Sequence, residues 1–419
     1  MDDIRGMRNN LGQVKTIMLP EIAESITDVV CHELSLWPQE ADDLLSIMEA
    51  ISRGDLKWVL AACAKAVSDN NLLMARWCMG ELRGMVSISG EPIQRLGAYM
   101  LEGLVARLAA SGSSIYKSLQ SREPQSYQFL SYVYFLHEVC PYFKFGYMSA
   151  NGAIAEAMKD EDKVHIIDFQ IGQGTQWVAL IQAFAARPRG APNIRITGIG
   201  AGSNLVTVGK RLEKLANKFS VPFKFNAVSR SICDVQVENL DVRKGEALGV
   251  NFAFMLHHLP DESVSTENHR DSLLRMVKGL SPKVVTLVEQ ECNINTSPFL
   301  PRFLETLSYY TAMFESIDVM LPRNHKDRIN IEQHCLARDV VNIIACEGAE
   351  RIERHELLGK WKSRFSMAGF QPYPLSSIVS ATIRALLRDY NNGYGVEERD
   401  GALYLGWMNR ILVSSCAWK

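Results

Sequence analysis

The chain has 419 residues, of which 47% are hydrophobic and 22% charged, and its 45 basic residues nearly balance its 47 acidic ones. This composition is typical of a large globular protein and excludes extensive disorder, and the small net charge gives no general attraction to nucleic acid or to an anionic membrane. No apolar run reaches the roughly 18 residues of a membrane-spanning helix, so we expect no membrane association. The nine cysteines are scattered without a C-x-x-C pair, which favours reduced thiols over a disulfide framework or a zinc site.

Amphipathic helices are predicted in the first part of the chain. Residues 1–50 read as a short extension, and helical spacing in it predicts that part of it is helical. That spacing is carried by Ile22, Ile26, Val29 and Val30. Between residues 56 and 108 apolar residues recur every three or four positions, with a polar break at 68–71. We therefore expect a helical cap over residues 51–155.

The same helices contain the first candidate interaction surface. The stretch 72–86 has a heptad-like seam, which either pairs with a partner helix or packs inside its own helical lobe. A seam of about two heptads is too short to establish a coiled coil. The candidate partner-binding residues chosen from this seam and the next helix are Leu72, Met79, Leu82 and Leu96.

The pattern changes near residue 160, where a strand, a glycine-containing loop and a helix follow one another. Further strands are predicted at 194–199, 223–228, 251–256 and 284–289, with helical segments between most of them, so the sheet should be parallel and doubly wound. The chain closes with strands at 394–398, 402–408 and 411–417, separated by tight turns at Asp400-Gly401 and Asn409-Arg410, which are typical of antiparallel pairing.

These elements predict an α/β fold: a Rossmann-like, methyltransferase-type sheet, parallel with an antiparallel edge, plus an α-helical cap. The first part of this core should occupy residues 156–294, and residues 361–419 should complete it. The intervening segment, 295–360, is longer than one crossover helix needs, so we expect it to add helices to the cap. An apolar face is predicted there from Phe299, Phe303, Leu307, Tyr310 and Phe314.

The loop after the first strand is the candidate cofactor site. A methyltransferase loop carries glycines two, four and six residues after the acidic residue that ends this strand, so that backbone can approach the cofactor. Here Asp168 is followed by Gln170, Gly172 and Gly174, and the second strand ends at Gly200 instead of in an acidic residue for the ribose hydroxyls. Each charge-assisted bond lost with that carboxylate costs about 1.5–3 kcal/mol. We expect an altered pocket with no cofactor and no catalysis.

His257 and His258 are the strongest argument for an enzyme, because they lie near the carboxyl end of a predicted strand, where such sheets bind ligands. One of them could act as a general base. Adjacent residues of a strand point to opposite faces, however, and no third metal ligand is evident. A structural role is the alternative, and we predict no metal site.

Several ordered motifs resemble those of the GRAS family. Residues 164–168 read VHIID, which is the family's signature pentapeptide, and residues 351–356 are similar to its R-V-E-R element. Residues 298–310 resemble its P-F-Y-R-E motif, and residues 361–369 have its W-x7-G spacing. The match extends from about residue 50 to the end. Residues 324–330 resemble the scarecrow-like proteins of the phytochrome-A-signalling branch.

The resemblance implies a plant transcriptional co-regulator in light or hormone signalling, without catalysis. Its partners would be DNA-bound transcription factors and signalling proteins, with a homodimer as a further association and the nucleus, together with the cytoplasm, as its location. The alternatives are a small-molecule S-adenosylmethionine-dependent methyltransferase and a direct DNA-binding factor. Direct DNA binding should be weak or absent, because the sequence has no DNA-binding motif and its charges are balanced.

Charged residues of the family motifs supply the second set of candidate partner-binding residues. They form either a surface for partners or internal ion pairs between cap and core. The residues are Arg302, Glu305, Arg351 and Arg354.

Overall fold

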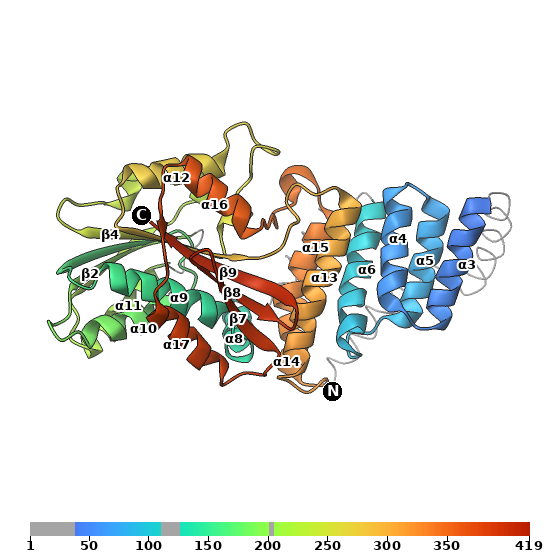
Figure 1. Cartoon of the computed structure of the whole chain (residues 1–419), viewed down its shortest axis with the longest axis horizontal. Helices are drawn as coiled ribbons and strands as arrows, with labels where there is room; N and C mark the ends of the chain where they lie inside the picture. The colour runs from blue at the N-terminus through green and yellow to red at the C-terminus, as the bar shows by residue number, and fades with distance from the viewer. Residues whose placement is uncertain (1–37, 110–125, 201–204) are drawn as a thin grey trace.

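The computed structural model describes residues 38–109, 126–200 and 205–419, and shows a sheet-containing core with a stack of helices at one end (Figure 1). The helical segment predicted around Ile22–Val30 lies outside the described residues. Among the described helices, none is long and apolar enough to cross a membrane.

A single nine-stranded sheet forms the centre of the core. Five strands run parallel in the order β3-β2-β1-β4-β5, and β9, β8 and β7 continue the sheet antiparallel, with β6 paired to β9. The parallel strands are β1 (Lys163–Asp168), β2 (Asn193–Ile199), β3 (Phe223–Val228), β4 (Ala247–Ala253) and β5 (Val284–Gln290). The others are β6 (Pro372–Tyr373), β7 (Tyr394–Arg399), β8 (Ala402–Trp407) and β9 (Arg410–Trp418). The predicted fold class is confirmed.

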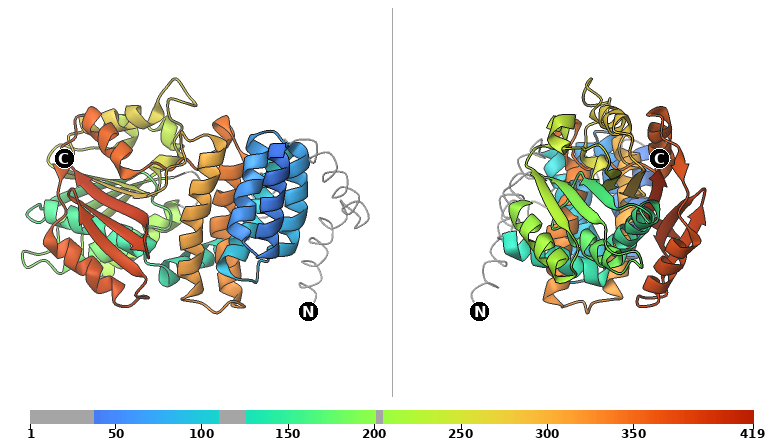
Figure 2. Two further views of the ribbon diagram at one scale, coloured as in Figure 1. Left: turned by 45° about the vertical axis from the view of Figure 1, so that its right-hand side comes forward. Right: turned by 90° about the vertical axis from the view of Figure 1, so that its left-hand side faces the viewer.

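Helices cover both faces of this sheet (Figures 1 and 2). Side chains of β5 alternate between the two faces, since Val284 and Val288 belong to one apolar cluster and Val285 and Leu287 to the other. The first cluster includes α9 (Tyr142–Ala157), α10 (Thr175–Ala185), α11 (Leu205–Lys218) and α17 (Ser377–Leu387). The second includes α12 (His269–Gly279) and α16 (Leu358–Met367). Burial on both faces explains why the central strands β4 and β5 are rich in apolar residues.

The cap is a stack of helices drawn from two distant parts of the chain (Figure 1). The first part supplies α3 (Pro38–Ser52), α4 (Leu56–Ser68), α5 (Leu72–Met85) and α6 (Pro92–Leu108). Against α6 lie α13 (Phe299–Asp318) and α15 (Ala337–Ala345). Between these two come α14 (Lys326–Ile331) and the π turn η4 (Glu332–Leu336), which contact α8 (Ser126–Val139). The polar break at 68–71 ends in a cap, because the Asn71 side chain accepts a hydrogen bond from the Met74 N–H at 3.1 Å.

The apolar face predicted on α13 is present. Phe303, Leu307, Tyr310 and Phe314 are buried, and Phe299 is partly buried against the same cluster. These residues recur at intervals of three or four, which places them on one side of the helix. This side anchors α13 between the cap and the core.

One predicted strand is displaced. The sequence placed it at 251–256, whereas β4 begins at Ala247 and ends at Ala253. Phe254 has a left-handed φ of 54°, which no strand can continue through, and residues 256–258 form a single 3₁₀ turn, η3 (Leu256–His258). The two histidines therefore lie on a turn and not on a strand.

Candidate functional site

Asp168 ends β1, and its carboxylate is fully engaged by the protein itself. Oδ2 accepts a hydrogen bond from the Trp177 indole at 2.8 Å, and Oδ1 accepts from the Gln170 backbone N–H at 3.2 Å and from the Asn251 amide at 3.3 Å. The side chain is buried. A carboxylate held in this way fixes the loop and the first turn of α10 and has little capacity left for a ligand.

A buried polar network continues from Asp168 across the sheet. In register, Asp168 pairs with Asn251 of β4, which pairs with Thr286 of β5. The Thr286 hydroxyl donates to the side-chain Oδ1 of Asn251 at 2.9 Å. The side-chain amides of Gln176 and Asn251 exchange two hydrogen bonds at 3.1 and 3.2 Å. Asn251 and Thr286 could not be identified from the sequence as partners of Asp168, because only strand register brings these distant residues together.

The glycines of the loop are explained by the fold. Gly172 and Gly174 have φ values of 50° and 65°, which suit glycine best. A Cβ on Gly174 would also lie 3.0 Å from Cγ1 of Val208. At the neighbouring strand, Ile171 is buried with its Cδ1 only 2.7 Å from the place of a Cβ on Gly198. The chain thus fills the space beside the loop with its own side chain.

The remaining candidates for the altered pocket contribute less to the loop. The Gln170 side chain is exposed, and Gly200 is half-buried after the last residue of β2. Residues 201–204, which follow Gly200, lie outside the described part of the chain. The loop geometry therefore rests on Asp168 and the two left-handed glycines.

Titration of Asp168 should be visible in the stability of the protein. Burial raises its pKa to about 6, although the hydrogen bonds from Gln170, Trp177 and Asn251 favour the charged form. In the unfolded chain the same carboxyl group has a pKa near 3.9, so the folded state binds its proton more tightly. As the pH rises from roughly 4 to 6, the free energy of unfolding should therefore fall by about 1.4 kcal/mol per pH unit. Urea denaturation of the wild type and Asp168→Asn across this range checks this. Parallel curves for the two proteins would contradict it.

Among the apolar candidates for partner binding, only Leu72 is accessible, with 43% of its surface exposed. Met79, Leu82 and Leu96 are buried among the cap helices. The seam they form packs inside its own lobe, because α4 and α6 lie against it. These three side chains do not form an accessible docking surface in this fold, which corrects that interpretation.

The charged candidates are also largely internal. Arg302, Arg351 and Arg354 are buried, and Glu305 is half-buried. Arg302 donates to the Ile343 carbonyl at 3.1 Å, and Glu305 pairs with Arg410 of β9 at 2.6 Å. The structure thus favours the alternative of ion pairs and hydrogen bonds between segments over a free charged surface.

The last two arginines belong to an extended stretch, residues 351–356, that passes through the interior. Arg351 donates to the carbonyls of Ile294 and Asn295 at 3.0 and 2.7 Å, and Arg354 donates to the Asn295 side chain at 3.2 Å. These bonds fasten the stretch to the segment that follows β5. The burial of Arg351 and Arg354 is possible because residues far away in the chain accept hydrogen bonds from them.

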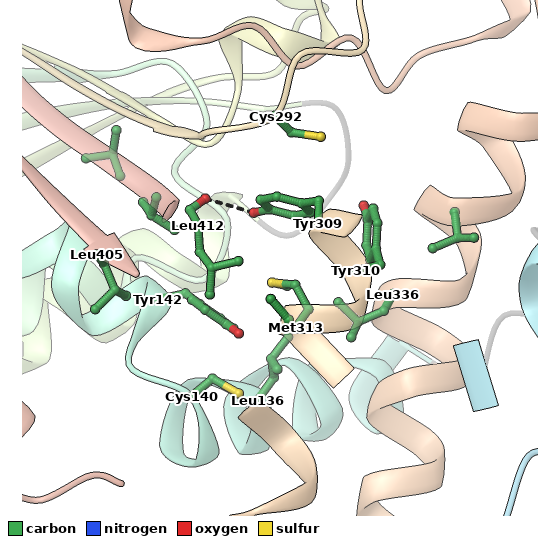
Figure 3. Packing of buried hydrophobic residues seen from close by; sticks show 14 of the residues in the cluster. Leu136, Cys140, Tyr142, Cys292, Tyr309, Tyr310, Met313, Leu336, Leu405 and Leu412 are labelled. Carbon is green, nitrogen blue, oxygen red and sulfur yellow. Dashed lines mark hydrogen bonds between the residues drawn. The ribbon is translucent and has the colours of Figure 1, made fainter. Parts of the chain in front are cut away.

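A pocket of about 340 Å³ opens between the carboxyl ends of the sheet strands and the cap. Figure 3 shows Tyr142, Tyr309, Met313 and Leu336 around this junction, where the Tyr309 hydroxyl donates to the Leu412 carbonyl at 2.8 Å. Ligands of open α/β sheets bind at this edge. Polar groups also reach the pocket, and they include His258, Gln290, Arg338, Asp339 and Glu353.

His257 and His258 converge on Glu353, which lines this pocket together with His258, contrary to the expectation that the two histidines point apart. Their Nε2 atoms lie 3.4 and 3.3 Å from the carboxylate of Glu353. Although burial alone would lower the pKa of His257, the carboxylates of Glu289 and Glu353 raise it to about 10. The expectation of opposite faces was wrong because both residues lie on a 3₁₀ turn, where consecutive side chains are about 120° apart.

Comparison with known proteins gives one consistent result. Residues 56–419 match the GRAS domain family. Scarecrow-like protein 21 of Arabidopsis thaliana is 87% identical over 413 residues, spanning 99% of this chain and 100% of that protein. Scarecrow-like transcription factor PAT1 of the same plant is 66% identical over an alignment that covers 100% of this chain and 87% of that protein. The crystal structure of SCL7 in Oryza sativa superposes with a TM-score of 0.75 at 33% identity, covering 87% of this chain and 99% of that one. The similarity includes both cap and core.

Proposed function

Since the chain belongs to the GRAS domain family, we propose that it is a transcriptional co-regulator that acts by binding other proteins and not by catalysis. Relatives with high identity are named as scarecrow-like proteins, and one of them as a transcription factor. The non-catalytic part of the proposal rests on Asp168, whose carboxylate accepts three hydrogen bonds from the protein itself and has little capacity left for a ligand.

The sequence of the loop that follows β1 supports the absence of methyl transfer. Gln170 replaces the first loop glycine, and β2 ends at Ile199 without an acidic residue, so the ribose of S-adenosylmethionine would find no carboxylate there. Ile171 occupies space beside the loop. Calorimetry of the purified chain with S-adenosylmethionine should give no saturable heat. Binding in the micromolar range would refute this part of the proposal and favour the methyltransferase alternative.

Action through proteins, and not by reading DNA bases, is supported by charge. The chain has a net charge of −2, whereas phosphate contacts from basic residues supply most non-specific affinity for DNA. We propose that it docks on DNA-bound transcription factors. Fusing the chain to an unrelated DNA-binding domain should change transcription of a reporter gene in plant cells, whereas the purified chain alone should show no sequence-selective DNA binding. An inactive fusion, or selective binding by the chain alone, would overturn this.

The biological setting is proposed from relatives. Chitin-inducible gibberellin-responsive protein 2 of Oryza sativa is 57% identical over 427 residues, which supports a role in hormone signalling, and the resemblance to the phytochrome-A branch supports light signalling as the second setting. We place the protein in the nucleus and in the cytoplasm, and include a homodimer among its assemblies. Imaging of a fluorescent fusion in plant cells tests the location.

Leu72 is the accessible candidate for partner binding, at the first position of α5. Leu72→Asp should leave stability within about 0.5 kcal/mol of the wild type, because the side chain is exposed, yet reduce recovery of nuclear partner proteins about tenfold. Quantitative mass spectrometry of proteins co-purified from plant nuclei measures this. The matched control is Leu304→Asp on α13, where a leucine is 42% exposed. Equal recovery with both variants would remove Leu72 from the docking surface.

A further inference from the structure

Three imidazoles surround one buried carboxylate at the junction of cap and core. The Nε2 atoms of His257, His258 and His355 lie 3.4, 3.3 and 3.4 Å from the carboxylate oxygens of Glu353. The ring centroid of His257 is 4.0 Å from that of His258 and 4.1 Å from that of His355. Two segments far apart in the chain, η3 and the stretch 351–356, thus bring three potential metal ligands, His257, His258 and Glu353, to one point, with His355 beside them.

The distances are those of ligands around an ion. A hydrogen bond from an imidazole to a charged carboxylate is about 2.7–2.9 Å long, which is shorter than all three separations. Ligands about 2.05 Å from a tetrahedral zinc ion lie roughly 3.3–3.4 Å from each other. Nε2 of His257 and Nε2 of His258 are therefore too far from the Glu353 carboxylate for good hydrogen bonds and well placed to share a small cation with it.

The other nitrogen of His257 is held as in known metal sites. Its Nδ1 lies 2.6 Å from Oε2 of Glu289, a true hydrogen-bond distance. The second oxygen of Glu289 accepts from the backbone N–H groups of Met255 and Leu256 at 3.1 and 2.8 Å, so this carboxylate is fixed. Metal-bound histidines commonly donate their second N–H to a carboxylate, which orients the ring and strengthens the ligand. Nε2 of His257 is thereby directed to Glu353, and since a metal ligand must be deprotonated, a bound ion would displace the proton that the two carboxylates hold on this ring.

His355 provides an independent observation. The residue is completely buried, yet neither ring nitrogen has a hydrogen-bond partner. A buried polar group without a partner destabilises the folded state. The His355 ring packs against His257, with the centroids 4.1 Å apart, so a ring without a hydrogen-bond partner borders the three ligands.

We propose that His257, His258 and Glu353, whose ligand atoms lie within 4.8 Å of one another, bind a divalent transition-metal ion, with zinc as the ion that suits this set best. Imidazole and carboxylate ligands favour zinc and its neighbours in the transition series over the hard cations Mg²⁺ and Ca²⁺. His258 is 34% exposed and lines the pocket together with Glu353, which gives the ion a path from solvent. The bound ion would fasten the stretch 351–356 to the end of β4. This site is independent of the proposed transcriptional role.

The test uses the whole chain, purified without a metal-affinity tag and dialysed against chelator, and titrates it with Zn²⁺ by calorimetry. One ion per chain should bind with a dissociation constant in the micromolar range or tighter. His258→Gln, at the half-exposed ligand, should weaken binding more than tenfold, and Glu289→Gln, at the orienting carboxylate, by about 10- to 100-fold. The matched control is His269→Gln, which breaks a separate histidine–glutamate contact of 3.2 Å and should leave Zn²⁺ affinity unchanged.

Two further measurements make the outcome decisive. Co²⁺ should give visible absorption characteristic of nitrogen and oxygen ligands in the wild type and lose it in His258→Gln. Circular dichroism of every variant separates loss of a ligand from loss of the fold. The proposal is overturned if the folded wild type binds no stoichiometric Zn²⁺, or if His258→Gln and His269→Gln bind it equally well; His257 would then be a protonated member of an ion cluster.

Discussion

Replacing Leu82 with aspartate is expected to unfold the helical cap. The side chain has no exposed surface and lies in α5 among the apolar residues of the main cluster. The substitution removes a buried aliphatic group and places a carboxylate among apolar side chains, so a loss of roughly 4–5 kcal/mol or more is expected. That loss approaches the whole stability of many domains. Urea denaturation and the soluble yield of the variant measure it.

Leu72→Asp is the matched control, since it puts the same charge on the same helix at an exposed position. It should unfold at nearly the wild-type urea concentration. If Leu82→Asp were soluble and as stable as Leu72→Asp, the packing of α5 against its neighbours would be wrong. Loss of partner binding in Leu82→Asp would report unfolding of the cap and not removal of a docking contact.

Replacing Glu332 with glutamine should destabilise the protein by roughly 3–5 kcal/mol, because it removes the carboxylate that Arg328 pairs with and leaves Arg95 with Asp318 alone. Glu332 lies in η4 and is buried between two guanidinium groups. Nη1 of Arg328 lies 2.6 Å from its carboxylate, and Nη2 of Arg95 lies 3.0 Å from it. Arg95 keeps one other acidic partner, Asp318, at 2.8 Å. The midpoint of guanidinium chloride denaturation measures the change.

An exposed ion pair provides the comparison for Glu332. Lys65 and Asp69 are 2.9 Å apart, but both side chains are more than half exposed. Lys65→Gln should therefore cost less than about 0.5 kcal/mol, since solvent already screens this pair. A similar small loss in Glu332→Gln would mean that water enters the cluster and that it does not hold η4 against α6.

Local patterns were enough for most of the elements. The strand and glycine loop ending in Asp168, the amphipathic helices at 56–108 and the closing hairpins follow from alternation, helical spacing and turn residues within a few positions of each other. The Asp400-Gly401 turn, for example, has φ values of 52° and 72°, which the two residues tolerate. The displaced strand β4 is the exception, because the left-handed Phe254 that ends it has no signal in the sequence.

The sequence by itself therefore determined the parallel sheet, its antiparallel edge, the cap helices and the family motifs, because each depends on short-range periodicity or on a contiguous motif. Tertiary structure alone decided which distant residues the internal polar groups contact. Asp168 is satisfied by Asn251, and Glu353 lies among three histidines, through contacts between residues far apart in the chain. A charged residue appears solvent-exposed in a sequence until its distant partner is known, since burial of a charge is tolerated only when that partner is in place.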